Sequence, residues 1–312
     1  MATARRSTAE IEIAASAAVA PQPAGTGELA PGVVTRLSDR VRRIIAPNPS
    51  LMTGPGTGTY LVGVDGGDLA VIDPGPAHDR HLDRVAEVGG GAIRWILVTH
   101  THADHSPGAP GLSERTGAPT VGQSRTDDDF VPDVVAGDGW SLTLEGPTTL
   151  RALHTPGHAS NHLCWLIEEE DLLFSGDHVM DASTVVIAPP DGDMAAYLEQ
   201  LQRLRALGLR AIAPGHGRLI TDPDARLDEY LRHRRAREAQ VLAELGTTPR
   251  TVEDLVRAIY TETPEALRPV AKFSVWAHLR KLKADRLADS GDPDDVGAAW
   301  IAGAARIAAP AR

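Results

Sequence analysis

The chain has 312 residues, 42% of them hydrophobic and 23% charged, a composition typical of one large globular domain beside a small one, or of two medium-sized domains. The net charge of -11 argues against nonspecific binding of nucleic acid, which usually requires a basic surface. The acidity is uneven, because residues 31–221 hold 14 Lys and Arg against 24 Asp and Glu, whereas residues 222–312 hold 15 of each.

The first 30 residues are rich in Ala, Pro, Gly and Thr without periodicity, which predicts a disordered N-terminal arm over 1–30. Two arginines ahead of an Ala-rich stretch loosely imitate a signal peptide, but Glu10 and Glu12 fall where its apolar region should begin. A single cysteine, Cys164, excludes an intrachain disulfide, and no apolar run approaches membrane-spanning length. We therefore expect a cytoplasmic protein that does not bind a membrane.

Apolar runs in the first half predict short strands separated by turns. Residues 41–45 and 60–64 are apolar enough for two strands, with a Gly- and Pro-rich loop between them, and residues 69–72 form a third. The third ends in Asp73-Pro-Gly, where the carboxylate is either a turn former or a group that orients a metal-bound histidine. Helical spacing over 78–89, closed by three glycines, precedes the next strand and predicts mixed α/β layering.

The apolar run 95–99 leads directly into His100-Thr-His102-Ala-Asp104-His105. Imidazole and carboxylate are the usual ligands of zinc-type metals, and side chains at the end of a buried strand converge in a small volume. Alternate positions His100 and His102 can face one ion while Asp104 and His105 reach another. This pattern predicts a metal site rather than a polar loop.

Three later apolar runs also end in a glycine that is followed by a histidine or an aspartate. They lead into Thr155-Pro-Gly-His158, Ser175-Gly-Asp177 and Pro214-Gly-His216. Glycine allows the backbone to turn sharply at a strand end, so the next side chain can point into a shared site. A helix is predicted over 193–207. Residues 106–111 are too rich in Gly and Pro for a helix start, and the region from there to Trp140 is too polar and acidic to assign.

Three helices are predicted in the C-terminal part, and together with a short wing they make a winged-helix-like domain over 222–301. The first helix starts at Asp222, which is followed by Pro, and the second starts at Thr251 with a capping-box pattern. The third is expected over 264–287, with a break near Phe273.

Basic residues are frequent in this domain, whose wing includes Trp300 and is followed by a tail over 302–312. The basic residues of interest are Arg232, Arg234, Arg235, Arg237, Arg280, Lys281 and Lys283. They could form a phosphate-binding stripe, but acidic residues balance them one for one, which favours solvated helix faces. The domain could also pack beside the active site or form a homodimer contact.

The motif HxHxDH, followed by a later His, Asp and His, resembles the signature of the metallo-β-lactamase fold superfamily. The resemblance implies an αββα sandwich over 31–221 and a site for two zinc ions. The implied ligands of the first ion are His100, His102 and His158, those of the second are Asp104, His105 and His216, and Asp177 bridges the two. Iron or manganese in place of zinc remains open.

Within this superfamily the chain is similar to the group of beta-lactamase-like protein 2. The similarity rests on the loop 48–63, Thr155-Pro-Gly-His158, Phe174-Ser-Gly-Asp177, Ser183-Thr-Val185 and the character of residues 222–287. It implies the C-terminal winged-helix-like domain. Since the eukaryotic member of the group is a mitochondrial endoribonuclease, it also implies RNA as a substrate. One departure is Gly58, where the loop otherwise resembles a G-T-N-T-Y-L pattern, so an amide contact near the site is expected to be missing.

Two zinc ions a few ångströms apart would hold a bridging hydroxide and polarise the substrate, so no Ser or Cys nucleophile is needed. Asp104 is the expected catalytic acceptor of the hydroxide proton, and Asp73, His162 and Tyr60 are candidates for contacts behind the ligands or with substrate. We expect a zinc-dependent hydrolase of a small ester, thioester or lactone. Cleavage of single-stranded RNA is the alternative, ahead of β-lactamase activity and of a non-enzymatic DNA-binding regulator.

Overall fold

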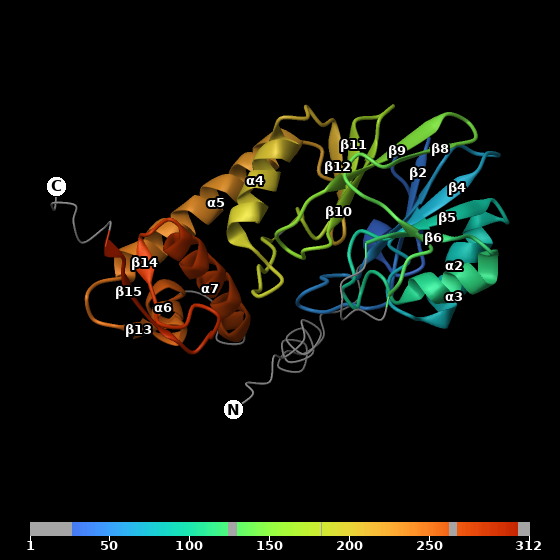
Figure 1. The fold of residues 1–312 in the computed structure, drawn as a ribbon. Helices are drawn as coiled ribbons and strands as arrows, with labels where there is room; N and C mark the ends of the chain where they lie inside the picture. The colour runs from blue at the N-terminus through green and yellow to red at the C-terminus, as the bar shows by residue number, and fades with distance from the viewer. Residues whose placement is uncertain (1–26, 124–129, 182, 262–266, 305–312) are drawn as a thin grey trace.

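Two β-sheets lie face to face in the computed structural model, and helices cover the outer side of each (Figure 1). The structure describes residues 27–123, 130–181, 183–261 and 267–304. In these residues no helix is both long and apolar enough to cross a membrane. A smaller helical domain lies at the far end of helices α4 and α5, away from the helices α2 and α3 of the first sheet.

The first sheet has seven strands that follow one another in chain order. They are β1 (Val34–Arg36), β2 (Val41–Ile45), β3 (Gly58–Val62), β4 (Leu69–Ile72), β5 (Ile93–Leu97), β6 (Thr120–Gly122) and β7 (Val134–Val135). Strands β1 to β4 are antiparallel, and β4 to β7 are parallel. Helices α2 (Asp79–Gly89) and α3 (Gly108–Thr116) connect the parallel strands and cover the outer face, with Gly90 ending α2 in the left-handed conformation.

The second sheet has five strands. They are β8 (Ser141–Leu144), β9 (Thr148–His154), β10 (Leu163–Ile167), β11 (Leu172–Gly176) and β12 (Ala211–Pro214), in the spatial order β12-β11-β10-β9-β8. Only β11 and β12 are parallel, and helix α4 (Met194–Arg205) connects them. Helix α4 and helix α5 (Pro223–Glu244) cover the outer face.

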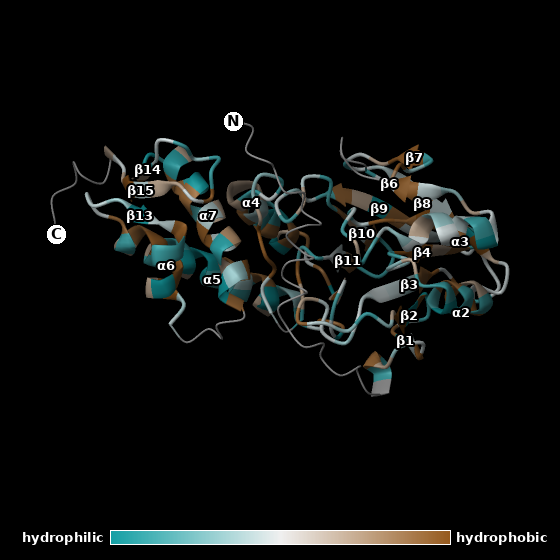
Figure 2. Ribbon diagram, turned by 90° about the horizontal axis from the view of Figure 1, so that it is seen from below, coloured by the Kyte–Doolittle hydropathy of each residue, from teal (hydrophilic) through white to brown (hydrophobic). Residues whose placement is uncertain are grey.

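Both faces of strands β3, β4, β10, β11 and β12 are buried, which explains why their sequences are mostly apolar. In β10, Trp165 points into the core between the sheets, where Tyr60 and Phe174 also lie with their rings 5.0 Å apart. The neighbouring Cys164 and Leu166 point outward and pack under α4 and α5. Figure 2 shows hydrophobic colour on parts of both sheets and hydrophilic colour on much of α2. The predicted αββα sandwich is confirmed.

The C-terminal domain combines helices with a three-stranded sheet, where the sequence predicted three helices and a short wing. Beyond α5, its elements are β13 (Arg250–Thr251), α6 (Val252–Ile259), α7 (Arg268–Ala284), β14 (Ala288–Asp289) and β15 (Ala299–Ala302). The capping box at Thr251 is formed, and Trp300 is fully buried in the domain core. Helix α5 joins both domains, because Leu227 packs in the core under α4 while Val241 packs with α6 and α7. The boundary predicted at residue 222 thus falls at the start of a shared helix.

Two predictions about helices were wrong. The segment after the histidine motif forms α3 despite its glycines and prolines. The close packing of this helix requires a small residue, since a Cβ at Gly108 would lie 2.9 Å from the carbonyl oxygens of Pro74 and Gly75. Helix α7 runs without a break through Phe273, and the start expected at 264 lies outside the described residues.

The predicted N-terminal arm is described only at its end. Residues 27–29 form a short 3₁₀ turn (η1, Gly27–Leu29), so order begins slightly earlier than expected. The prediction of disorder over residues 1–26 lies outside the described residues, as does most of the predicted tail beyond residue 304.

Candidate metal centre

The seven predicted ligands meet at one edge of the sandwich, where loops follow the carboxyl ends of strands from both sheets. His100, His102, Asp104 and His105 follow β5, His158 follows β9, Asp177 follows β11 and His216 follows β12. Potential ligand atoms lie within 4.8 Å of one another in three overlapping groups. We call His100, His102 and His158 the first cluster and Asp104, His105 and His216 the second cluster.

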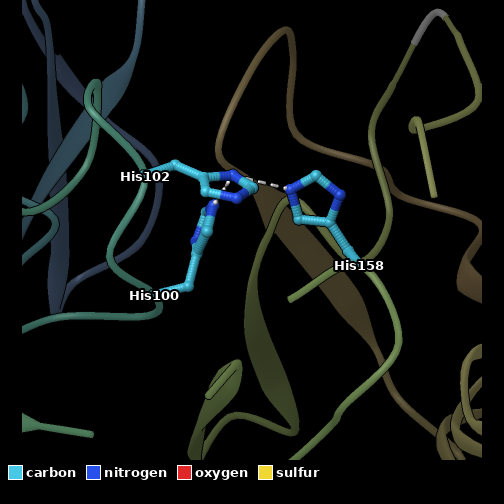
Figure 3. Close-up of side chains that lie close together, drawn as sticks. All are labelled: His100, His102 and His158. Atoms are coloured by element: carbon cyan, nitrogen blue, oxygen red, sulfur yellow. Dashed lines mark hydrogen bonds between the residues drawn. The ribbon is translucent and has the colours of Figure 1, made fainter. Parts of the chain in front are cut away.

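The first cluster brings three ring nitrogens together. His100 Nε2 and His158 Nε2 each lie 3.0 Å from His102 Nδ1. In Figure 3 the rings approach from opposite sides, His100 and His102 from one loop and His158 from the facing one. Ligands about 2.0–2.1 Å from a tetrahedral zinc ion would be roughly 3.3 Å apart, so the observed spacing is close to what one ion requires.

Hydrogen bonds behind the first cluster fix which nitrogen carries the proton in two of its rings, His100 and His158. Thr99 Oγ1 gives its single proton to Asp73 Oδ2, so it must accept a hydrogen bond from His100 Nδ1, 3.0 Å away. His158 Nδ1 lies 2.8 Å from the carbonyl oxygen of Val186, which can only accept. In the neutral rings, the Nε2 atoms of His100 and His158 therefore present lone pairs to the centre, as a metal ligand must.

The second cluster sets two imidazoles against two carboxylates. His216 Nε2 lies 3.1 Å from Asp104 Oδ2 and 3.3 Å from Asp177 Oδ1, and His105 Nε2 lies 3.3 and 3.4 Å from the same oxygens. His105 Nε2 and Asp177 Oδ1 are buried, and neither has a hydrogen-bond partner among the described residues. Buried polar atoms left in this way are rare and mark a place where a cation fits.

Electrostatics at the second cluster favour positive charge. Burial opposes protonation of His105 and His216, but the nearby carboxylates outweigh burial: the pKa of His105 is raised well above its usual value and that of His216 is raised to about 10. Burial likewise opposes ionisation of Asp104 and Asp177, yet the two histidines hold the pKa of both carboxyl groups well below the usual range. A divalent cation would supply the same charge as these protons.

In the first cluster the pKa values of the histidines shift in the opposite direction. Burial is the largest cause of a pKa well below the usual value at His100, and the neighbouring histidines lower it further. Burial also lowers the pKa of His102. These rings are neutral at pH 7 and can donate lone pairs without first losing a proton.

Asp177 lies between the two clusters. Its Oδ2 is 3.8 Å from His158 Nε2 of the first cluster, while its Oδ1 faces His105 and His216 of the second. The two oxygens of one carboxylate are thus directed at different clusters. This is the arrangement that the resemblance to the superfamily implied for a bridging ligand.

Asp73 supports the motif from behind. Its Oδ1 accepts from the backbone N–H of Thr99, and its Oδ2 accepts from the Thr99 hydroxyl and from His105 Nδ1, each at 2.8 Å. The residue has φ 50°, a left-handed conformation that costs on the order of 1 kcal/mol for a non-glycine residue. Such strain at a buried carboxylate fits the predicted orienting role.

Tyr60 and His162 also lie behind the ligands and not toward solvent. Tyr60 donates a 2.6 Å hydrogen bond to the carbonyl oxygen of Pro214, and burial raises its pKa to about 12. His162 is fully buried, with its ring 5.0 Å from the ring of His100. Of the two roles predicted for them, this burial favours support of the ligands over contact with substrate.

Thr57 contacts a candidate ligand and Asn48 holds Thr57, and neither was predicted as a site residue. Thr57 Oγ1 donates to Asp104 Oδ2 at 3.0 Å and accepts from Asn48 Nδ2 at 2.9 Å. Both lie in the turn-rich loop before β3, where polar residues look like turn formers. Gly58 lies beside the segment that carries His216: its N–H donates to Gly215 O at 2.8 Å, and a Cβ there would face the Tyr60 side chain at 3.2–3.3 Å.

The two carboxylates are the most exposed of the candidate ligands. The side chains of His100 and His105 are almost fully buried, whereas the side chain of Asp104 is 21% exposed and that of Asp177 is 13% exposed. A substrate would therefore reach the centre over the two carboxylates.

An αββα sandwich that carries two clusters of histidines and carboxylates at its strand ends is typical of metal-dependent hydrolases. Residues 53–216 match the family model of the Metallo-beta-lactamase superfamily, and residues 251–300 match that of the Beta-lactamase associated winged helix domain. The chain belongs to the metallo-beta-lactamase superfamily of hydrolases and carries its associated winged-helix domain.

Relatives resemble the chain over most of its length. A beta-lactamase-like protein 2 homolog of Drosophila melanogaster is 35% identical over 286 residues, which cover 84% of this chain and 94% of the relative. An atrochrysone carboxyl ACP thioesterase of Aspergillus chevalieri is 34% identical over 274 residues, covering 81% and 84%. The fold matches a metallo-beta-lactamase family protein of Thermus thermophilus, with a TM-score of 0.71, 22% identity and coverage of 86% of this chain and 100% of the other.

Proposed function

We propose that the protein is a hydrolase with two metal ions, preferably zinc, that cleaves the acyl bond of a small thioester or related ester or lactone. The observation that carries this proposal is the position of Asp177, whose two oxygens face two separate clusters of histidines. The first cluster would hold one ion and the second cluster the other, with Asp177 shared between them. Iron or manganese would be compatible with the same donors.

Bound metal ions would supply Lewis acidity and lower the pKa of water to near neutrality. The chain's own groups orient and receive protons around them. Asp104 is ionised and partly exposed, so it can accept the proton of the attacking water, and the hydroxyl of Thr57 fixes its orientation. The balanced reaction joins one water to a thioester and releases a carboxylic acid and a thiol.

A cysteine nucleophile is not available as an alternative. Cys164 is fully buried under α4, and burial raises the pKa of its thiol to about 12. Its sulfur also accepts a hydrogen bond from Thr155 Oγ1 at 3.3 Å. Because the thiolate is the reactive form, this residue does not attack substrate.

A thioester is favoured over RNA for two reasons. One relative of 34% identity is named as an ACP thioesterase. In addition, several of the basic residues that could hold RNA phosphates are engaged within the C-terminal domain: Lys281 pairs with Glu238, Lys283 pairs with Asp289, and Arg234 is buried. Arg232 and Arg235 are exposed. Phosphate binding requires cationic side chains that are exposed and free to release counterions.

The test is a parallel activity screen of the zinc-loaded protein. We would compare an acyl-coenzyme A thioester, a lactone, a cephalosporin and single-stranded RNA, each with and without a chelator. The proposal expects chelator-sensitive turnover with the highest kcat/KM on the thioester, ester or lactone substrates. Selective cleavage of RNA would establish the endoribonuclease alternative, and hydrolysis of the cephalosporin alone would favour a β-lactamase. Turnover of the thioester that survives metal removal would contradict the proposed chemistry.

A further inference from the structure

The segment 185–187 lies between the metal centre and the C-terminal helices. On one side, the carbonyl oxygen of Val186 accepts the hydrogen bond from His158 Nδ1 at 2.8 Å. On the other, the neighbouring carbonyl of Val185 accepts a hydrogen bond from the guanidinium of Arg234 on α5. The N–H of Ile187 also donates to Ser274 Oγ on α7, at 3.5 Å. One short stretch of backbone thus contacts both a candidate ligand and two helices.

Helix α5 holds this region with one face. Arg226, Tyr230 and Arg234 are spaced four residues apart, so they lie one above another along the helix. Arg226 donates to the carbonyl oxygens of Met180 and Ser183, both at 2.9 Å, and Tyr230 donates to that of Ser183 at 2.6 Å. Arg234 continues the row two residues beyond Ser183, at the carbonyl of Val185, which adjoins the contact with His158.

Arg234 is an unusual residue to find in this position. It is 2% exposed, and no ion pair with an acidic residue is present within the described part of the chain. The guanidinium lies 5.3 Å from the centre of the Tyr197 ring, and its Nε has no hydrogen-bond partner there. Burying a cation without a carboxylate is costly. A hydrophobic residue would fill the space at a lower cost, so the contact with Val185 is the property that distinguishes arginine here.

We propose that Arg234 is a positioning residue for the metal centre. By holding the Val185 carbonyl it fixes the adjoining peptide, so that Val186 O keeps the proton of His158 on Nδ1 and directs Nε2 into the first cluster. This inference rests on the proposed function, since it takes His158 to be a metal ligand. Groups that orient a ligand from behind typically change metal affinity by about 10–100-fold.

The effect is confined to one of two ions. Arg234 reaches His158 in the first cluster, and the second cluster is supported by other groups: His105 by Asp73 and Asp104 by Thr57. Loss of Arg234 should therefore weaken one binding step and leave the other nearly unchanged. A role limited to stabilising the fold would lower the unfolding temperature without separating the two steps.

The experiment compares Arg234→Met with Arg232→Met, an exposed arginine on the same helix, and with Arg234→Lys. Stepwise zinc affinities would be measured by competition with a chromogenic chelator, cobalt(II) spectra would report the ligand field, and thermal unfolding of the metal-free proteins would report stability. We expect Arg234→Met to weaken one zinc step about 10–100-fold and to change the cobalt spectrum. Arg234→Lys should recover part of the affinity, and Arg232→Met should match the wild type.

Equal affinities in Arg234→Met and the wild type would overturn the inference, as would equal weakening of both steps. If Arg234→Met does not fold, Arg234→Gln is measured in the same way, because its amide is too short to reach the Val185 carbonyl. Failure of the wild type to bind two ions would instead count against the proposed function, so the two failures can be told apart.

Discussion

Charged side chains are arranged in opposite ways in the metal centre and in the C-terminal domain. In the C-terminal domain, Lys281 lies between Glu238 and Asp285, at 2.9 and 2.8 Å, and each charge has a local partner. In the metal centre, Asp104 and Asp177 converge, and among the described residues their only ion-pair contacts are histidines. Paired charges need no further counterion, whereas two converging carboxylates that are largely shielded from water need protons or metal ions to balance their charge.

The two regions also differ in how far their charged groups are buried, and burial sets the strength of the electrostatic interactions. The Lys and Asp pairs of the C-terminal domain are partly exposed, so water screens them and each adds little to stability. The centre is buried, and the interactions of its charges are correspondingly strong. We therefore expect substitutions in the centre to act mainly on metal binding and turnover, and those in the C-terminal domain to have small effects.

The largest effect is expected from Asp177→Asn, which keeps the shape of the side chain but removes its charge. An amide cannot replace the carboxylate between two cations, so metal content should fall below two ions per chain and turnover should fall by at least about 100-fold. Metal content by mass spectrometry and steady-state kinetics would check this. Asp83→Asn on α2, where the carboxylate is exposed and pairs with Arg115, is the matched control. Unchanged activity in the Asp177 variant would rule out the shared-ligand role.

The next effect is a loss of stability at acidic pH, which we expect from a buried histidine that has no acidic partner in the part of the chain that the structure describes. Burial lowers the pKa of His81 from 6.5 to about 4, with no carboxylate among the causes, whereas Glu238 opposes the effect of burial at His278. Between pH 6.5 and 4 the unfolded state binds more protons at His81 than the folded state does. The free energy of unfolding should therefore fall as pH falls through this range, by on the order of 3 kcal/mol from this residue.

His81→Gln should flatten that loss of stability between pH 6.5 and 4, as measured by urea unfolding at several pH values. The exposed His78→Gln serves as the control and should leave most of the loss in place. Identical pH profiles for the wild type and His81→Gln would show that His81 does not carry this part of the acid sensitivity.

A smaller effect is expected from Thr57→Val, which removes the hydroxyl that donates to Asp104 but keeps the side-chain volume. The zinc affinity of one site should fall by about 10-fold, since the carboxylate loses a group that orients it. Thr57→Ser retains the hydroxyl and should stay close to the wild type. Chelator competition would measure both, and a loss of the same size in the serine variant would point to packing instead of the hydrogen bond.

The smallest effect belongs to the C-terminal domain. Lys283→Gln breaks the pair with Asp289, which is exposed, so the free energy of unfolding should change by less than about 1 kcal/mol. Because Lys283 already has an acidic partner, the variant should also leave turnover and any binding of single-stranded RNA unchanged. A marked, salt-dependent drop in RNA binding would show that this domain does contact phosphate.

The ligand residues could be predicted from sequence because their chemistry is repeated at strand ends. An apolar run and then a glycine precede each of His158, Asp177 and His216. The apolar run indicates the strand and the glycine indicates the turn, so both can be recognised from neighbouring residues alone. Thr57 and Asn48 could not be found in this way. Hydroxyl and amide side chains are common in turns, and only the folded chain shows that Thr57 meets Asp104, 47 residues away.

Some helices were predicted correctly from the sequence and others were not. Asp222 and Thr251 marked helix starts correctly, since caps are local. Helix α3 was missed because its glycines disfavour a helix in isolation, and its close packing on the Pro74 and Gly75 carbonyls overrides that preference. Arg234 was grouped with the exposed basic residues, since nothing in the local sequence shows which face of α5 packs against the segment 185–187.

Titration of the metal-free protein with zinc, with bound metal and thioester turnover followed together, tests the two-metal centre most directly. We predict that turnover rises to a maximum at two ions per chain and is lost when a chelator removes them. Saturation at one ion per chain, or turnover that does not depend on bound metal, would contradict the two-metal centre proposed for the HxHxDH motif, His158, Asp177 and His216.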